Sequence, residues 1–143
     1  MSTAIQKAES IVSRPQRQVG KRDLFQALLT MLVFDLVLSI GGFKRLYQIV
    51  QRWGVKPRPT DPAAIRRICD AVDRACTLYP KHALCLLRSA VTSCLLRHHG
   101  VAARMVIGCR KLPFAGHAWV EVDGRVVNDG PAVQRLYAVL DRL

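Results

Sequence analysis

Residues 116–129 read GHAWVEVDGRVVND, and this stretch decides the class of fold. Polar or aromatic side chains alternate with small aliphatic ones as far as Val122, which is the pattern of a strand with two different faces. Asp123-Gly124 then interrupts the alternation with a dipeptide that favours a tight hairpin turn. The stretch therefore predicts two antiparallel strands, Gly116–Val122 and Arg125–Asp129.

The register of this hairpin decides which side chains meet. A two-residue turn would point His117 and Asp129 to opposite faces of the sheet. A three-residue loop, with its glycine in the left-handed conformation of a G1 bulge, would instead pair His117 with Asp129 and Glu121 with Arg125. Because that register joins a histidine to a carboxylate and also pairs two opposite charges, we predict the bulged hairpin.

The chain around the hairpin contains four further predicted elements. Thr60 or Asp61 can cap a helix whose first residue is Pro62. From the spacing of apolar side chains we expect helices over Pro62–Leu78 and Ala83–His99. We also expect a strand over Ala103–Arg110 and a closing helix over Pro131–Leu143. Helices followed by an antiparallel sheet make the predicted fold class α+β.

The N-terminal part of the chain is polar at first and then strongly apolar. We expect residues 1–20 to be a poorly ordered lead-in, residues 21–54 to be an apolar helical pair joined at Gly41-Gly42, and residues 55–143 to form the main domain. The first apolar helix could be a short membrane span, but Asp35 near its centre makes insertion costly. We therefore favour burial against the domain or a partner protein.

Composition limits the classes of function. Of the 143 residues, 50% are hydrophobic, which excludes wholesale disorder, and the formal net charge is +12. That charge suits an anionic partner, but the basic residues form no tail or block, so we expect no nucleic-acid-binding arm. The five cysteines show no C-x-x-C spacing and no signal peptide opens the chain, which fits neither a disulfide framework nor a zinc site. We expect free thiols, no metal and a cytoplasmic location.

Three residues could carry chemistry together: Cys85, His117 and Asp129. Cys85 lies in the first turn of a predicted helix, where free backbone N–H groups and the helix dipole favour a thiolate and could hold an oxyanion. With His117 as base and Asp129 as its orienting carboxylate, this is the arrangement of a nucleophilic acyl transfer. Cys94 lies nine residues further along, on the opposite side of the same helix, so we expect it to be structural.

The motifs around these residues resemble one known family. The stretches CLLRSAVTSCLLRHHG (85–100), VIGCR (106–110) and GHAWVEVDGRVVND (116–129) are similar to the leader peptidases of lasso-peptide biosynthesis. These B proteins are transglutaminase-like, papain-type cysteine proteases. The resemblance covers roughly residues 80–129 and implies that the chain removes the leader from a lasso-peptide precursor. It assigns the nucleophile to Cys85, the base to His117 and the orienting carboxylate to Asp129.

The same resemblance implies protein partners and no bound cofactor. The residues that precede Pro62 are helical and apolar, so the chain resembles the protease half of a split system, in which a separate protein recognises the precursor leader. An asparagine-synthetase-like macrolactam cyclase is a further implied partner. Some family members need ATP when the cyclase is present, and this sequence contains no phosphate-cradling loop of the G-x-x-x-x-G-K-[ST] type.

Two other functions stay open from the residues alone. A non-catalytic basic binding module would use the positive charge, although that charge is dispersed along the chain. The same Cys-His-Asp set would also serve an enzyme that transfers an acyl group to an amine instead of to water. Competition between an added amine and water distinguishes the two enzymatic reactions.

Overall fold

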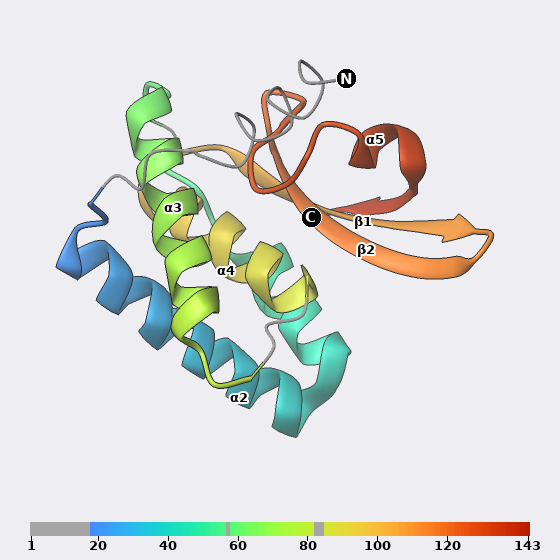
Figure 1. The fold of residues 1–143 in the computed structure, drawn as a ribbon, viewed down its shortest axis with the longest axis horizontal. Coiled ribbons are helices and arrows are strands. Elements are labelled where there is room, and N and C mark those ends of the chain that lie inside the picture. Colours follow the sequence, from blue (N-terminus) through green and yellow to red (C-terminus); the bar gives the residue numbers. More distant parts are fainter. Residues whose placement is uncertain (1–17, 57, 82–84) are drawn as a thin grey trace, which may run out of the picture.

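The computed structural model describes residues 18–56, 58–81 and 85–143, and within them helices precede an antiparallel sheet (Figure 1). The helices are α2 (Lys21–Arg52), α3 (Pro62–Leu78), α4 (Cys85–His98) and the short α5 (Val133–Leu136). The strands are β1 (Ala103–Lys111), β2 (Phe114–Val122), β3 (Arg125–Val126) and β4 (Ala138–Arg142), in the order β3-β2-β1-β4. The fold class is α+β, as the sequence predicts. Residues 1–17 of the predicted lead-in lie outside the described residues.

Helix α4 lies between the α2–α3 pair and the sheet (Figure 1). Every residue from Ser89 to Arg97 is buried, as expected for a helix with neighbours on all sides. The main core joins α2, α3, α4 and one face of the sheet, with Met31, Val72 and Val120 among its members. These contacts fix the position of the first turn of α4, which begins at Cys85.

Helix α2 is kinked at the glycine pair that the sequence singles out. Gly42 has a φ of 67° and a ψ of −172°, which glycine adopts without steric cost, so α2 consists of two helical stretches. Asp35 accepts hydrogen bonds from the Tyr79 hydroxyl (2.8 Å) and the Lys81 ammonium (3.0 Å), and these bonds lower the pKa of Asp35. The one acidic side chain in the apolar stretch is therefore paired within the domain.

The outer side of α2 is apolar and exposed. Its large exposed side chains recur every three or four residues, with five in line before the kink at Gly42 and Phe43 just after it. We call this set the α2 row: Phe25, Leu29, Leu32, Leu36, Ile40 and Phe43. By length and hydropathy α2 is also the one helix in the described ranges that could cross a membrane. A continuous apolar surface of this kind marks a site of interaction.

The hairpin between β2 and β3 differs from the predicted register. Asp123 and Gly124 both have positive φ (50° and 74°), and Val122 lies opposite Arg125 across a two-residue turn. The predicted bulged loop, which would have put Glu121 opposite Arg125, is therefore wrong. Two consecutive left-handed residues match the twist of a two-stranded hairpin, so this Asp-Gly pair closes it without a bulge.

The predicted closing helix over Pro131–Leu143 is also wrong. Only Val133–Leu136 is helical, and Ala138–Arg142 forms β4, which pairs with β1. Strand β2 pairs with one edge of β1. Without β4, the other edge of β1 would expose a row of backbone N–H and C=O groups. Pairing with β4 satisfies those groups, which a helix packed on the sheet would not do.

Arg97 connects the helices to the end of the sheet through main-chain oxygens. Its buried guanidinium donates to the oxygens of Ala103 (2.8 Å), Val50 (2.6 Å) and Leu143 (2.7 Å). Burial lowers the pKa of Arg97, but a guanidinium remains charged throughout the physiological range. One side chain thus binds the end of α2, the start of β1 and the C-terminal strand.

Replacing Arg97 with methionine should lower the free energy of unfolding by at least about 3 kcal/mol, because the main-chain oxygens of Ala103, Val50, Trp53 and Leu143 all lose a charged donor. Urea denaturation followed by circular dichroism measures the change. Arg74 is exposed on α3, and Arg74→Met, the matched control, should change stability by less than about 0.5 kcal/mol. Equal stability of Arg97→Met and wild type would contradict this role.

Candidate active site

Cys85 is the first residue of α4 and is half-buried, which agrees with its predicted place in the first turn of that helix. The backbone N–H groups of a first helical turn have no partner within the helix. They attract negative charge, so they can stabilise an oxyanion beside the helix end. Residues 82–84, which precede this turn, lie outside the described part of the chain.

Three of the other cysteines, Cys69, Cys76 and Cys94, have different surroundings. All five thiols are free. Burial raises the pKa of Cys69 to about 12 and that of Cys94 to about 11, and burial also raises the pKa of Cys76. Such thiols are protonated at neutral pH and are poor nucleophiles. Cys94 is completely buried, as predicted for a structural residue on the side of α4 away from Cys85.

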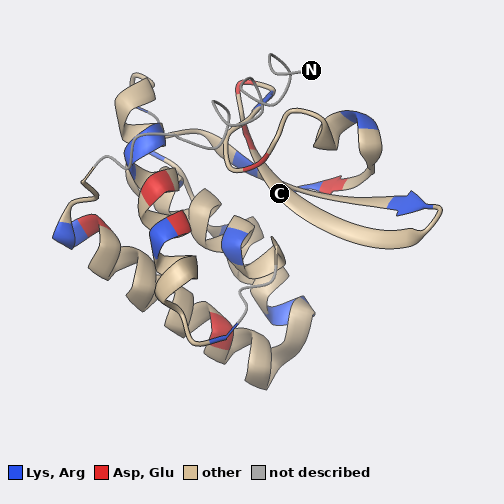
Figure 2. Ribbon diagram, viewed as in Figure 1, with Lys and Arg blue, Asp and Glu red and all other residues tan. Residues whose placement is uncertain are grey.

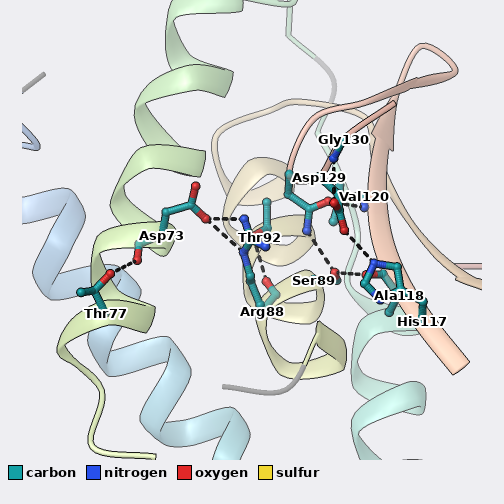
Figure 3. A network of polar contacts seen from close by, with 11 residues as sticks. Asp73, Thr77, Arg88, Ser89, Thr92, His117, Ala118, Val120, Asp129 and Gly130 are labelled. Atoms are coloured by element: carbon teal, nitrogen blue, oxygen red, sulfur yellow. Dashed lines mark hydrogen bonds and ion pairs between the residues drawn. The ribbon is translucent and has the colours of Figure 1, made fainter. Parts of the chain in front are cut away.

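His117 and Asp129 meet, as the sequence predicts. His117 Nε2 lies 2.7 Å from Asp129 Oδ2, and both side chains are partly exposed. A carboxylate oxygen can only accept, so Nε2 carries the proton and the Nδ1 lone pair of the neutral ring is free. Asp129 Oδ1 accepts a second hydrogen bond, from the Gly130 backbone N–H (2.7 Å), which fixes the carboxylate (Figure 3).

The pair forms for a different reason from the predicted one. In the observed register, continued pairing would place His117 and Asp129 on opposite faces of the sheet. The Val127 N–H still bonds to the Val120 carbonyl (3.0 Å), but beyond this point the chain leaves the sheet. Asp129 therefore belongs to a bend instead of a strand, and its side chain reaches His117 from there.

Two aromatic rings pack against the imidazole ring of His117. The Tyr137 ring stacks on the imidazole with centroids 5.0 Å apart, and the Trp119 ring lies 6.2 Å away in a similar orientation. The Arg110 guanidinium lies over the Tyr137 ring at 5.7 Å. Sequence reasoning missed Tyr137 because it assigned this residue to a closing helix, and no local signal points to its stacking role.

Glu121 anchors the same face of β2. It is buried and accepts hydrogen bonds from Trp119 Nε1 and Gln134 Nε2, both at 2.9 Å. Burial acts to raise the pKa of Glu121, but these hydrogen bonds and the nearby Arg142 outweigh it, and the pKa lies below its ordinary value. The predicted partner of Glu121, Arg125, is replaced by these groups. They hold the Trp119 ring beside the histidine.

Cys85 lies at the end of α4 that is nearest His117. Cys85 and Ser89 are one turn apart on the same side of the helix. The Ser89 hydroxyl donates to the carbonyl of Ala118 (2.9 Å), the residue after His117 (Figure 3). The other end of α4 lies at the start of β1, where Arg97 bonds. In the described ranges no hydrogen bond joins Cys85 to His117, so the structure pairs His117 with Asp129 and places the Cys85 thiol at the neighbouring helix end.

Two comparisons with known proteins found similar sequences. The model of the transglutaminase-like superfamily matches residues 28–142, which include all three candidate residues. Over 56 residues the chain is 39% identical to the microcin J25-processing protein McjB of Escherichia coli. That alignment covers 39% of this chain and 27% of the relative, so the chain matches about a quarter of the relative's length. No solved structure matches the chain significantly.

Proposed function

This chain belongs to the transglutaminase-like superfamily, and from that premise we propose that it is the cysteine peptidase that removes the leader from a lasso-peptide precursor. The observation that carries the proposal is the 2.7 Å pair of His117 and Asp129 beside a helix that begins with Cys85. Its likeness to a protein named for processing microcin J25 supports a peptide substrate of that class.

In the proposed reaction the thiol of Cys85 loses its proton to His117 Nδ1, and Sγ attacks the carbonyl carbon of the amide between leader and core. The N–H groups at the start of α4 stabilise the oxyanion. The amide C–N bond then breaks, and Nδ1 gives its proton to the leaving amine. Water next attacks the thioester with Nδ1 as base, which releases the leader acid and restores the thiol. His117 Nε2 keeps its proton throughout and donates it to the Asp129 carboxylate, which fixes the tautomer.

The product explains the proposed partners. Cleavage frees the N-terminal amine of the core, and that amine is the nucleophile a macrolactam-forming cyclase needs. We propose an asparagine-synthetase-like cyclase and a separate leader-recognition protein as partners, with the reaction in the cytoplasm, where thiols stay reduced. The net charge of +12 would favour an acidic leader, and binding would then weaken as salt rises.

The alternative of a basic binding module has less support. Figure 2 shows basic residues spread over the helices and the sheet, with acidic residues between them, instead of a single basic surface. Nucleic-acid-binding domains concentrate their Lys and Arg side chains on one face. The paired His117 and Asp129 would also have no purpose in such a module.

A cleavage assay tests the proposed function. The chain is incubated with a precursor peptide and the recognition protein encoded beside it, and the products are identified by mass spectrometry. We expect a leader with a free carboxylate and a core with a free amine. With methylamine added, hydrolysis should still dominate. A leader methylamide as the main product would favour amine transfer, and an intact precursor would contradict the proposal.

A further inference from the structure

The backbone of β2 is left without a strand partner at two buried positions. Val120 receives a bond from the Val127 N–H, so its N–H and C=O point to the β3 edge. Backbone groups two residues apart point to the same edge, so the Ala118 carbonyl points there too. Because β3 ends at Val126, neither the Val120 N–H nor the Ala118 carbonyl has a main-chain partner among the described residues on that edge.

Two side chains take the place of the missing strand. Asn128 Oδ1 accepts from the Val120 N–H (2.7 Å), and Asn128 Nδ2 donates to Ser89 Oγ (3.0 Å). The Ser89 hydroxyl in turn donates to the Ala118 carbonyl (2.9 Å). Asn128 and Ser89 are buried, with 7% and 1% of their surfaces exposed, so each of these groups depends on the others for hydrogen bonding.

This chain of bonds connects the three segments that hold the candidate residues (Figure 3). Asn128 immediately precedes Asp129, and Ala118 immediately follows His117. Ser89 lies one turn after Cys85 on α4. We propose that Asn128 and Ser89 are positioning residues, which set the register of Cys85, His117 and Asp129 by replacing two bonds of the sheet. Their importance for catalysis rests on the proposed function, whereas their effect on the His117–Asp129 pair does not.

Asn128→Ala tests this role because alanine removes both the acceptor for Val120 and the donor to Ser89. Asp129 then loses its anchor, and His117 loses the hydrogen bond that fixes its tautomer. In leader cleavage, measured per folded molecule well below the unfolding temperature, kcat should fall about 100-fold while KM changes little. A residue that only stabilised the fold would lower the unfolding temperature and leave kcat per folded molecule unchanged.

A second measurement needs no substrate. Long-range ¹H–¹⁵N spectra of the full chain labelled with ¹⁵N-histidine report which ring nitrogen of His117 carries the proton. Near pH 8 we expect the Nε2–H form in wild type, and Asn128→Ala should shift both ring nitrogen signals toward those of an unpaired histidine. The matched control is Ser93→Ala, which removes a buried hydroxyl of α4 that donates to the carbonyl of Ala90 in its own helix (3.1 Å). Its spectrum should equal that of wild type.

The two measurements separate the inference from the proposed function. Shifted His117 signals in Asn128→Ala, together with a wild-type protein that cleaves no leader, would support positioning by Asn128 and contradict the peptidase. Unchanged His117 signals in a folded Asn128→Ala protein would overturn the inference, whatever the activity. If Asn128→Ala does not fold, Ser89→Ala decides in the same way, because it keeps the bond between Asn128 and Val120. A shift of the His117 signals in Ser89→Ala supports the inference, and their absence overturns it.

Discussion

Replacing Cys85 with alanine is expected to abolish leader release, with a loss of at least about 10⁴-fold in the rate of cleavage. The variant lacks the only atom in the proposed mechanism that can form a covalent bond to the substrate. His117 and Asp129 keep their 2.7 Å contact, since neither bonds to the thiol. The folded state should therefore persist, because Cys85 is half-buried and lies at a helix end.

Cys94→Ala is the matched control for this prediction. It removes a thiol from the same helix, but from a completely buried position where burial raises the pKa to about 11. We expect it to lose about 1 kcal/mol of stability or somewhat more through a small cavity and to keep its activity. Mass spectrometry measures leader release by both variants, and circular dichroism checks that they fold. A folded Cys85→Ala protein that still cleaves would refute a thiol peptidase.

Elements with local signals were predictable from the sequence. Asp61 caps α3 by accepting from the Ala63 N–H (2.9 Å), and the helix spans Pro62–Leu78, as its cap, proline and apolar spacing predict. The break in α2 at Gly42 was also predictable from a local signal, because only glycine adopts this positive φ at low cost. Each of these features depends on neighbours within a few residues in the chain.

Features that depend on distant partners were not predictable in this way. Strand β4 forms because β1 has a free edge, and the sequence of residues 138–142 does not reveal that edge. Ser89 and Asn128 are 39 residues apart and bond only after α4 has packed against β2. Small polar side chains such as these occur at many surface positions, so nothing in the sequence marks the two as buried partners.

The His117–Asp129 contact was predicted correctly from an incorrect register. The bulged loop was chosen because it paired two sets of opposite groups, but the Asp-Gly turn closes with two residues and β3 ends early. Asp129 reaches His117 because β3 ends early and the chain turns back. Asn128 takes the place of a further strand residue by accepting from the Val120 N–H, and Asp129 follows it outside the sheet.

Deleting residues 1–54 should leave an insoluble or unfolded protein. Helix α2 places four large buried side chains in the core: Met31, Phe34, Leu46 and Val50. At roughly 1.5–3 kcal/mol for each, their loss is comparable with the roughly 5–15 kcal/mol that stabilises a whole domain. Arg97 would also lose the Val50 and Trp53 oxygens to which it donates. Solubility after expression and the circular dichroism spectrum measure the outcome.

The α2 row provides the contrast to this deletion, because its side chains are exposed and contribute little to the core. The double variant Leu29→Gln, Leu36→Gln should leave a folded, soluble protein, since at least half of the surface of each residue is exposed (50% and 58%). If the row binds the recognition protein or the cyclase, the double variant should lose co-purification with that partner.

A membrane anchor predicts the opposite of the deletion result: full-length protein in the membrane fraction and a truncated protein that is more soluble and still active. A soluble, active fragment beginning near Gly54 would therefore show that the domain folds without α2 and would contradict the expected result of the deletion.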